Sequence, residues 1–370
     1  MKIGVDISQI AFSGTGVARY TTSLIETLLK MQNNITFVFF YSSLRQPIPK
    51  NIEKLILKKH ILKKYPLPPI LLSFIWNDLH IFPIELFIGK VDLFFSSDWT
   101  EPPTQYAKKM TTIHDLVIYK FPETSNKKII DTQKKRLHWV LKESKIILCD
   151  SISTQNDIME IYNINKNKLK VVYPSVKKIT ISKNQISEFN IKYSRINQFI
   201  LSVGKQEPRK NISTLINAFN SCNIQNLDLY IVGPEGWSQD KHISNVPYRV
   251  NKNVKFLGYV PDEELSYLYS KALAFFYPSL YEGFGYPVIE AMHAGCPVAT
   301  SNTSSLKEIT KGYGLLFNPH SENEIALQIK NLYNNEQLRS DLIKKGSQRA
   351  QYFSEDSFSD QLLSILKEIT

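Results

Sequence analysis

The chain of 370 residues carries 45 Lys and Arg against 34 Asp and Glu, a formal net charge of +11, and 43% of its residues are hydrophobic. This length favours two domains over one, and the composition is that of a globular chain rather than a disordered one. No apolar run reaches the ~18 residues that would predict a membrane-spanning helix. The N-terminus enters a strand pattern at once and leaves no room for a signal peptide, so we expect a cytoplasmic protein.

All of the positive surplus lies in the first half of the chain. Residues 1–180 hold 26 Lys and Arg against 15 acidic residues, whereas residues 181–370 hold 19 of each. Five lysines between positions 54 and 64 alternate with Leu and Ile, and an apolar run follows at 66–72. This pattern resembles a surface that sits on anionic lipid, although a solvated lysine-rich face fits it too. We find no finger, RNP-type or helix-turn-helix motif, which argues against a nucleic-acid partner.

The first half alternates strand-like runs with helical or loop segments. The strand-like runs are at residues 3–7, 36–41, 92–97, 110–115, 145–150 and 170–174. After the first run, Gly14 and Gly16 form a turn where backbone can approach a ligand, and a helical pattern follows. The alternation predicts a parallel sheet covered on both faces, with ligands beyond the carboxyl ends of its strands. His114 lies at one of those ends, where it is either a structural side chain or a ligand contact.

A second α/β series follows a polar segment rich in Lys, Ser and Asn. Its strand-like runs are at residues 199–204, 227–233, 253–258, 272–278, 296–301 and 314–318. We therefore predict an N-terminal Rossmann-like domain at 1–180, a linker at 181–197 and a C-terminal Rossmann-like domain at 198–352. A last helix is expected at 353–370.

Three cations follow the first strand of this second series. Lys205, Arg209 and Lys210 are concentrated where Asn211 is expected to cap a helix. Cations at a helix N-terminus oppose the helix dipole and repel one another. A bound anion would resolve that conflict, and lysine with arginine is a common pairing for phosphate oxygens.

The stretch from 272 to 294 reads as strand, glycine-rich loop and helix. Pro287 suits the start of the helix, whose unpaired backbone N–H groups form an anion site. Glu282 on the loop and Glu290 on the helix flank this site, an arrangement that suits a ligand with both hydroxyls and phosphates. The structural alternative is that a first-turn acid stabilises the dipole and the glycines serve only the turn.

The three cysteines, Cys149, Cys222 and Cys296, are far apart and lack metal-ligand spacing. We expect them to be buried free thiols.

The second half resembles the family 4 retaining glycosyltransferases. The similar segments are LysGlnGluProArgLysAsn (205–211), the run from TyrProSerLeuTyrGluGlyPheGly (277–285) to Glu308, and GlyLeuLeuPheAsnPro (314–319). Glu282 and Glu290 have the family's Glu-x7-Glu spacing. SerGlyThrGlyValAlaArgTyr (13–20) and ThrIleHisAspLeu (112–116) extend the resemblance into the first half.

The resemblance implies the GT-B fold, in which two Rossmann-like domains face each other across a cleft and the C-terminal helix crosses back to the N-terminal domain. It also implies a nucleotide-sugar donor, held mainly by the C-terminal domain, and a saccharide or polyprenyl-linked saccharide acceptor. No metal and no cofactor is implied, because the nucleotide sugar is a substrate. A site on the inner face of the membrane would suit the basic half of the chain.

Residue by residue, the resemblance assigns Glu290 to the ribose and Glu282 to the donor hexose. It assigns Arg209 and Lys210 to the diphosphate; Lys205 stands where many members have arginine, which keeps the charge and loses the bidentate grip.

Further positions match on both halves of the chain. The resemblance assigns His114 to the donor sugar, Gly16 to the loop beneath the diphosphate and Val260 to the base. Backbone amides of the loop would contact sugar and phosphate, at Gly283, Phe284 and Gly285.

The expected reaction is hexosyl transfer with retention. The SerAsnThrSerSerLeu loop (301–306) resembles that of members that use GDP-mannose, which we therefore favour as the donor. The expected setting is surface polysaccharide synthesis. Two alternatives remain open: a GT-B nucleotide-sugar hydrolase or epimerase, and an inactive binding or scaffold subunit.

Overall fold

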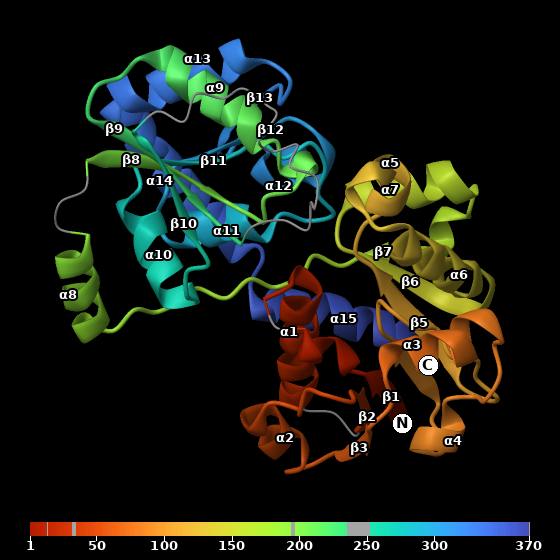
Figure 1. Ribbon diagram of the computed structural model, residues 1–370. Helices are drawn as coiled ribbons and strands as arrows, with labels where there is room; N and C mark the ends of the chain where they lie inside the picture. The colour runs from red at the N-terminus through yellow and green to blue at the C-terminus, as the bar shows by residue number, and fades with distance from the viewer. Residues whose placement is uncertain (13, 32–34, 194–196, 235–251, 370) are drawn as a thin grey trace. The chain divides into compact units, whose positions relative to one another are not determined.

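The computed structural model describes residues 1–12, 14–31, 35–193, 197–234 and 252–369 (Figure 1). The chain divides into two compact units. The first comprises Met1–Ser175 together with Glu355–Thr370, and the second comprises Val176–Ser354. The division falls five residues before the boundary predicted at residue 180.

The first unit is built on a seven-stranded parallel sheet with the order β3-β2-β1-β4-β5-β6-β7. The strands are β1 (Lys2–Asp6), β2 (Thr36–Ser42), β3 (Ile61–Tyr65), β4 (Leu93–Ser96), β5 (Lys108–Ile113), β6 (Ser144–Cys149) and β7 (Leu169–Val171). All but β3 were predicted. The order reverses between β1 and β4, so the loops that follow these two strands open towards a ligand crevice.

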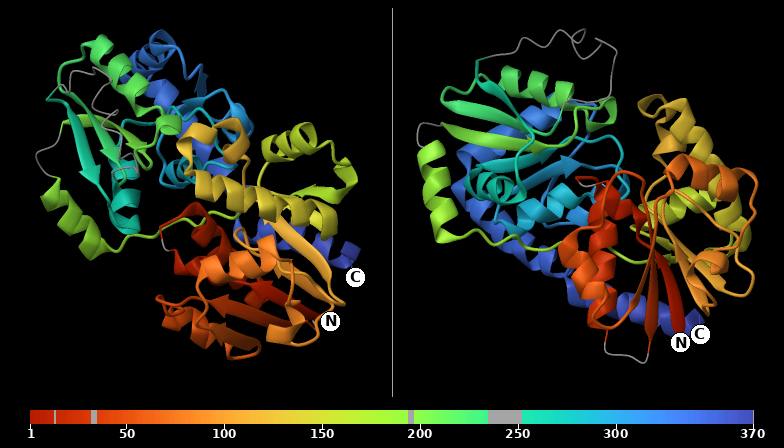
Figure 2. Two further views of the ribbon diagram at one scale, coloured as in Figure 1. Left: turned by 45° about the vertical axis from the view of Figure 1, so that its right-hand side comes forward. Right: turned by 60° about the horizontal axis from the view of Figure 1, so that its bottom comes forward.

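Helices cover both faces of this sheet (Figures 1 and 2). The α-helices of the unit are α1 (Gly16–Lys30), α2 (Lys50–Ile56), α3 (Pro69–Ser73), α4 (Glu85–Ile88), α5 (Val117–Lys120), α6 (Lys127–Glu143), α7 (Ile152–Tyr162) and α15 (Glu355–Ile369). A single π-helical turn, η2 (Phe74–Asp78), continues α3, and short 3-10 turns occupy η1 (Ser8–Ala11), η3 (Pro122–Thr124) and η4 (Lys166–Lys168). Strand side chains alternate between the faces: Phe37 and Phe39 pack with α1, and Val38 and Phe40 pack with η2 and α4.

The C-terminal helix α15 packs against the N-terminal unit, as predicted. Its apolar stripe at Phe358, Leu362 and Leu366 joins the core that α1 shares with β1 and β2. At its end, the Lys108 ammonium donates to the carbonyl of Ile369 at 2.6 Å. The helix therefore belongs to the first unit although the chain has passed through the second.

The lysine-rich stretch at 54–64 is not one continuous amphipathic element. Its first part ends α2, and its second part forms the edge strand β3. Lys64 pairs with Glu53 at 2.6 Å, which ties the strand to the helix. The lysines of this stretch are thus distributed over separate elements, with Leu55 and Leu57 exposed and Ile56 buried in the core.

The second unit contains a six-stranded parallel sheet with the order β10-β9-β8-β11-β12-β13. The strands are β8 (Gln198–Val203), β9 (Leu227–Val232), β10 (Val254–Gly258), β11 (Ala274–Tyr277), β12 (Val298–Ser301) and β13 (Leu315–Phe317). All six were predicted. The order reverses between β8 and β11, which places the crevice of this sheet at the carboxyl ends of those two strands.

The helices of the second unit include one within the predicted linker. They are α8 (Lys183–Lys192), α9 (Ile212–Cys222), α10 (Asp262–Lys271), α11 (Tyr286–His293), α12 (Ser304–Thr310), α13 (Glu322–Asn334) and α14 (Glu336–Gln351), with a 3-10 turn η5 (Pro208–Lys210). Ser182 and Gln185 form a capping box that starts α8, which explains why a polar segment is helical. Residues 194–196 of that segment lie outside the described residues.

One other sequence expectation is met. Cys149, Cys222 and Cys296 are buried free thiols. In the described part of the chain, every helix is too short or too polar to cross a membrane.

Candidate functional site

The carboxyl ends of β8 and β11 hold the charged residues that the sequence singled out in the second half. The loop after β8 carries Arg209 and Lys210, and the loop after β11 carries Glu282. Backbone hydrogen bonds join the loops, since Leu280 N–H donates to the carbonyl of Arg209 at 2.8 Å. Gly233 directly follows the neighbouring strand β9, and a Cβ added to it would lie 2.1 Å from the carbonyl oxygen of Gly204. Only glycine permits this approach beside the loop after β8.

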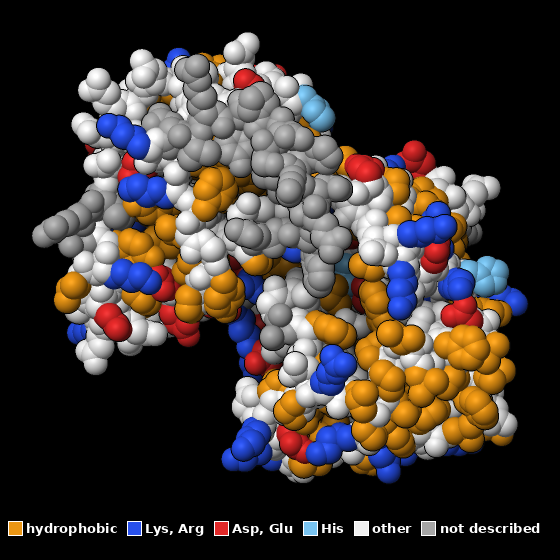
Figure 3. All heavy atoms as spheres, viewed as in Figure 1, with side chains coloured by type: hydrophobic (Ala, Val, Ile, Leu, Met, Phe, Trp, Pro, Cys, Tyr) orange, Lys and Arg blue, Asp and Glu red, His pale blue; other side chains and the backbone are white. Residues whose placement is uncertain are grey.

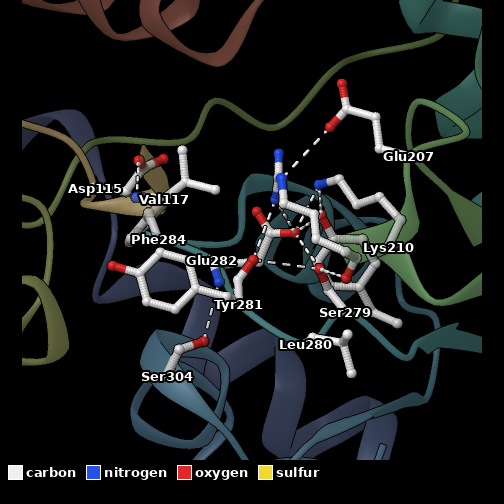
Figure 4. Close-up of polar contacts among 12 residues, drawn as sticks. Asp115, Val117, Glu207, Lys210, Ser279, Leu280, Tyr281, Glu282, Phe284 and Ser304 are labelled. Atoms are coloured by element: carbon white, nitrogen blue, oxygen red, sulfur yellow. Dashed lines mark hydrogen bonds and ion pairs between the residues drawn. The ribbon is translucent and has the colours of Figure 1, made fainter. Parts of the chain in front are cut away.

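Glu282 is the centre of this cluster (Figure 4). Its Oε1 atom lies 2.6 Å from the ammonium of Lys210 and 3.0 Å from Nη1 of Arg209. The hydroxyls of Ser279 and Tyr277 also donate to Oε1, at 2.5 and 3.0 Å. The two cations that were expected to await an anion are therefore already paired with a carboxylate of the same unit.

Burial and charge act in opposite directions on these groups. Burial alone would raise the pKa of Glu282, but Lys210 and Arg209 outweigh it and hold that pKa at about 2. For Lys210, burial prevails over the attraction of Glu282 and lowers its pKa. The balance differs because the neighbouring Arg209 favours the charged form of Glu282 but disfavours the charged form of Lys210. At neutral pH Glu282 is a carboxylate and is not a proton donor.

Serines at the start of α12 fix the loop that carries Glu282. The N–H of Glu282 donates to Oγ of Ser304 at 3.0 Å. The hydroxyl of Ser305 donates to the carbonyls of Glu282 and Phe284, at 2.8 and 2.7 Å. The loop is thus held by side chains from the next βα unit, and Glu282 has little freedom to move.

The glycine-rich turn leads directly into α11, as predicted. Gly285 is the N-cap residue of α11, with φ 115°, and an added Cβ would lie 2.9 Å from Leu306. Gly283 and Phe284 are buried beside it. The turn therefore brings the backbone to the N-terminus of α11, where N–H groups favour an anion.

Glu290 lies one turn into α11, on the wall of a hollow within the second unit. Tyr269 donates to its Oε2 at 3.4 Å. The hollow is also lined by Lys177, Lys178 and His293. Glu290 also lies near Tyr277, the hydroxyl partner of Glu282: burial, Glu282 and Glu290 all raise the pKa of that tyrosine.

The sequence also singled out Lys205, Val260 and Asn211 in this unit. Lys205 pairs with Glu207 at 3.1 Å, and Glu207 in turn reaches Nε of Arg209 at 3.4 Å. Val260 follows β10 and is buried. Asn211 is the N-cap residue of α9, as predicted, but its side chain makes no capping hydrogen bond. The side-chain nitrogen instead donates to the carbonyls of Pro278 and Pro319.

In the first unit, Gly16 and His114 are linked through α1. Gly16 is the first residue of α1, and Tyr20, one turn further, lies edge-on to the His114 ring with centroids 4.7 Å apart. Nδ1 of His114 lies 2.7 Å from Oδ2 of Asp150. Burial disfavours the charged imidazole, but Asp150 outweighs burial and raises the pKa of His114 to about 9. His114 is therefore protonated at neutral pH.

A polar hollow opens beside His114 at the point where the strand order of the first sheet reverses. The side chains around it include Asp6, Thr21, Ser97 and Asp98. Nη1 of Arg136 lies 3.1 Å from Oδ1 of Asp98.

Several of these side chains were missed in the sequence. They are Asp150, Glu207, Tyr277, Ser279, Ser304 and Ser305. Asp150 could have been found, because it ends the predicted strand next to that of His114. Within the described residues, we find no group of three or more His, Cys, Asp or Glu side chains that could hold a metal ion.

Comparison with known proteins places the chain in a family. Residues 14–177 match the family described as Glycosyltransferase Family 4, and residues 186–349 match Glycosyl transferases group 1. The O-antigen chain mannosyltransferase B of Escherichia coli is 31% identical over 272 residues, which are 72% of this chain and 71% of that protein. The chain belongs to the family 4 glycosyltransferases. The O-antigen chain mannosyltransferase RfbU of Salmonella typhimurium is 31% identical over 221 residues, 60% of each protein.

Solved structures show the same fold as this family 4 glycosyltransferase. Sucrose-phosphate synthase from Thermosynechococcus elongatus superposes with a TM-score of 0.75 at 18% identity, over 100% of this chain and 99% of that one. Anabaena Alr3699/HepE in complex with UDP-glucose gives a TM-score of 0.71 at 17% identity, over 100% of both chains. The predicted GT-B fold is thereby confirmed.

Proposed function

We propose that this glycosyltransferase moves a hexose, with retention of configuration, from a nucleotide sugar to a saccharide or polyprenyl-linked saccharide. Mannose from GDP-mannose is the donor we favour, and surface polysaccharide synthesis is the setting. The observation that carries the proposal is the cluster of Arg209, Lys210 and Glu282 at the carboxyl ends of β8 and β11. The names of the two enterobacterial relatives support mannose and a polysaccharide acceptor.

The donor roles follow from charge and geometry. Arg209, which is half-buried, and Lys210, which is buried, lie on one loop and offer a fork and a point charge to the diphosphate. Backbone N–H groups from Gly283 to Gly285 and the start of α11 add uncharged donors. Glu290 accepts hydrogen bonds from the ribose hydroxyls. Lys205 would add positive charge near the diphosphate, and Val260 would lie beside the base.

Glu282 has a double role in this proposal. With no anion bound, it neutralises Lys210 and Arg209 and holds both side chains in place. With donor bound, the diphosphate shares those cations, and the carboxylate orients hexose hydroxyls and supports positive charge at the ring. Because its pKa is about 2, it acts as a fixed negative charge rather than as an acid.

The reaction breaks the bond between the anomeric carbon and the phosphate oxygen and forms a bond to the acceptor oxygen. Stabilising the departing diphosphate is the largest available contribution, and preorganised cations supply it without reorganisation. We propose that the acceptor oxygen attacks the anomeric carbon on the same face from which the leaving group departs. The acceptor proton passes to a phosphate oxygen. The resemblance assigns His114 to the sugar, and as an imidazolium it would donate a hydrogen bond to a hydroxyl oxygen there.

We also propose that the reaction needs no metal ion and that the enzyme works in the cytoplasm, at the inner face of the membrane. Arg209, Lys210 and the helix N-terminus would supply the positive charge that a metal otherwise provides. The surplus of +11 in residues 1–180 would attract anionic lipid near a polyprenyl-linked acceptor.

The experiment is a panel of nucleotide sugars tested for the rise they cause in melting temperature. GDP-mannose should raise it most, and EDTA should leave the rise unchanged. The donor found this way is then incubated with a polyprenyl-linked saccharide, and NMR of the product gives the anomeric configuration. No rise with any donor would contradict the proposal, and an inverted product would contradict retention.

A further inference from the structure

Side chains at the start of α12 bind the segment that connects β11 to α11. We call this segment, residues 278–285, the donor loop. The hydroxyl of Thr303 donates to the carbonyl of Leu280 at 3.0 Å, and Oγ of Ser304 accepts the N–H of Glu282 at 3.0 Å. The next serine of α12 donates to two further carbonyls of the loop. A shift of α12 along its axis would therefore move Glu282.

The first residue of α12 has a strained backbone. Ser304 has a φ of 46°, a left-handed conformation that is unfavourable for a residue with a Cβ. Such a conformation persists only where the surrounding contacts hold it. Leu306 and Ile309 are completely buried and anchor the helix in the core. Because α12 is only seven residues long, contacts at its C-terminal end act close to this strained first turn.

Arg349, near the end of α14, caps the C-terminal end of α12. Its Nε donates to the carbonyl of Ile309 at 2.8 Å, and its Nη2 donates to the carbonyl of Glu308 at 3.1 Å. The last carbonyls of a helix have no partner within the helix, and a cation there also complements the negative end of the helix dipole. The planar guanidinium binds both carbonyls at once and thereby fixes the position of the helix end.

Aromatic rings hold the Arg349 guanidinium in turn. Lys and Arg side chains project from the surface of the second unit at scattered places (Figure 3), whereas Arg349 is half-buried. Its Cζ lies 4.8 Å from the ring centroid of Phe353, 5.0 Å from that of Tyr352 and 5.5 Å from that of Tyr313. Phe353 also lies edge-on to Phe284 of the donor loop, with centroids 5.5 Å apart. Arg349 thus reaches the donor loop by two routes, one through α12 and one through Phe353.

We propose that Arg349 is a positioning residue for the transfer reaction, which fixes α12 and thereby the place of Glu282 beside the donor sugar. This role rests on the proposed function, because it is there that Glu282 acts on the donor. Arg349 acts through the helix, since its hydrogen bonds are made to the carbonyls of Glu308 and Ile309. Precise placement matters for the rate, because a displacement of about 1 Å at a reacting centre costs about a hundredfold.

The alternative is that Arg349 only stabilises the second unit, and Arg339 provides a matched control for it. Nη1 of Arg339 caps α13 by donating to the carbonyls of Leu332 and Tyr333, at 2.7 and 3.1 Å. Both arginines are half-buried on α14. Helix α13, however, packs mainly on α9. The variants Arg339→Met and Arg349→Met therefore remove equivalent caps, and only the second should disturb Glu282.

The first test is hydrogen–deuterium exchange of the full chain without donor. In Arg349→Met, residues 279–285 should exchange about tenfold faster than in the unaltered chain, because the segment opens locally once α12 is released. In Arg339→Met, the same residues should exchange as in the unaltered chain, although both variants should lose a similar amount in melting temperature. Arg349→Lys, which keeps the charge but not the fork, should recover part of the protection, and it carries the comparison if Arg349→Met does not fold.

The second test is the rate of transfer from the donor that raises the melting temperature most. Arg349→Met should lower kcat up to about a hundredfold and change the KM for donor little, because the diphosphate is assigned to Arg209 and Lys210 on another loop. Arg339→Met should keep both constants.

The proposal is overturned if residues 279–285 exchange alike in Arg349→Met and the unaltered chain, or if Arg339→Met loosens them equally. It is also overturned if kcat persists in Arg349→Met while the exchange rises. An unaltered chain that transfers no sugar would contradict the proposed function instead, and the exchange comparison would still decide whether Arg349 holds the donor loop.

Discussion

The Glu282 carboxylate lies 2.6 Å from the Lys210 ammonium, although 72 residues separate them in the chain. Parallel strands β8 and β11 bring them together, because each residue follows one of two adjacent strands in the middle of the sheet. The contact means that the cations assigned to the donor diphosphate are oriented before any ligand arrives. Such preorganisation is how fixed charges contribute most to a reaction that develops negative charge.

Replacing Glu282 should reveal this pairing in the pH dependence of stability. A pKa lowered from 4.5 to about 2 contributes to the unfolding free energy above pH 4.5, and the contribution is lost as the pH falls towards 2. In total it amounts to about 3 kcal/mol. Urea unfolding should therefore show Glu282→Gln less stable at pH 7, with the difference from the unaltered chain shrinking by pH 3. Glu322→Gln, at an exposed position, is the control; a difference that stays constant with pH would contradict the pairing.

Arg209→Ala should separate donor binding from folding. Its guanidinium is partly exposed, and Lys210 remains to neutralise Glu282, so the fold should persist. Donor affinity should fall by ~1.5–3 kcal/mol, the range for hydrogen bonds to a charged group. Arg209→Lys should restore only part of it, since the fork is lost. Calorimetry measures both effects, with Lys330→Ala as a charge-matched control. Unchanged donor affinity in Arg209→Ala would show that Arg209 does not contact the donor.

Lys210→Ala, in contrast, should damage the protein itself. The ammonium is buried, and its removal takes from Glu282 the closest of its two cations. Breaking a buried pair costs ~3–5 kcal/mol. We expect a lower melting temperature as well as lost transfer, and a variant that melts as the unaltered chain does would show that the pair is dispensable to folding.

Glu290→Ala should weaken nucleotide binding without disturbing the ion-pair cluster. Glu290 lines a hollow with Tyr269, and its proposed partners are ribose hydroxyls. The loss should be ~1–3 kcal/mol, and it should disappear when a ligand without ribose, such as inorganic diphosphate, is titrated instead. Glu336→Ala, an exposed glutamate, serves as control. An equal loss of affinity for diphosphate would show that Glu290 does not act through the ribose.

His114 should titrate well above the ordinary range of histidine. With its pKa raised from 6.5 to about 9, it contributes about 3 kcal/mol to stability below pH 6.5, and this is lost as the pH rises through 9. NMR of the imidazole should give a midpoint near 9, and Asp150→Asn should lower it. Stability of His114→Gln should approach that of the unaltered chain at high pH, with exposed His320→Gln as control. A midpoint near 6.5 would contradict the role of Asp150.

Most of the architecture could be predicted because hydrophobic strands alternate with helical patterns. Strand β3 could not, since two adjacent lysines break its apolar pattern and an edge strand needs only one covered side. Helix α8 was concealed in a polar segment because its stability begins with a capping box instead of a buried face. Sequence patterns thus did not predict β3 and α8, the two elements that bury few or no side chains.

The site could be predicted in its residue types but not in its pairings. The sequence placed Arg209, Lys210 and Glu282 at the carboxyl ends of strands, yet read the cations as waiting for an external anion. Which strands are adjacent decides that they pair, and strand order is not written in the local pattern. The same holds for Asp150, whose contact with His114 depends on β5 lying beside β6.

The most direct test of the central claim is calorimetric titration of the full chain with GDP-mannose and with other nucleotide sugars. We predict saturable binding of a nucleotide sugar that the double variant Arg209→Ala/Glu290→Ala loses while keeping its cooperative unfolding. Binding of equal affinity in the double variant, or no binding of any nucleotide sugar or nucleoside diphosphate to the unaltered chain, would contradict the account.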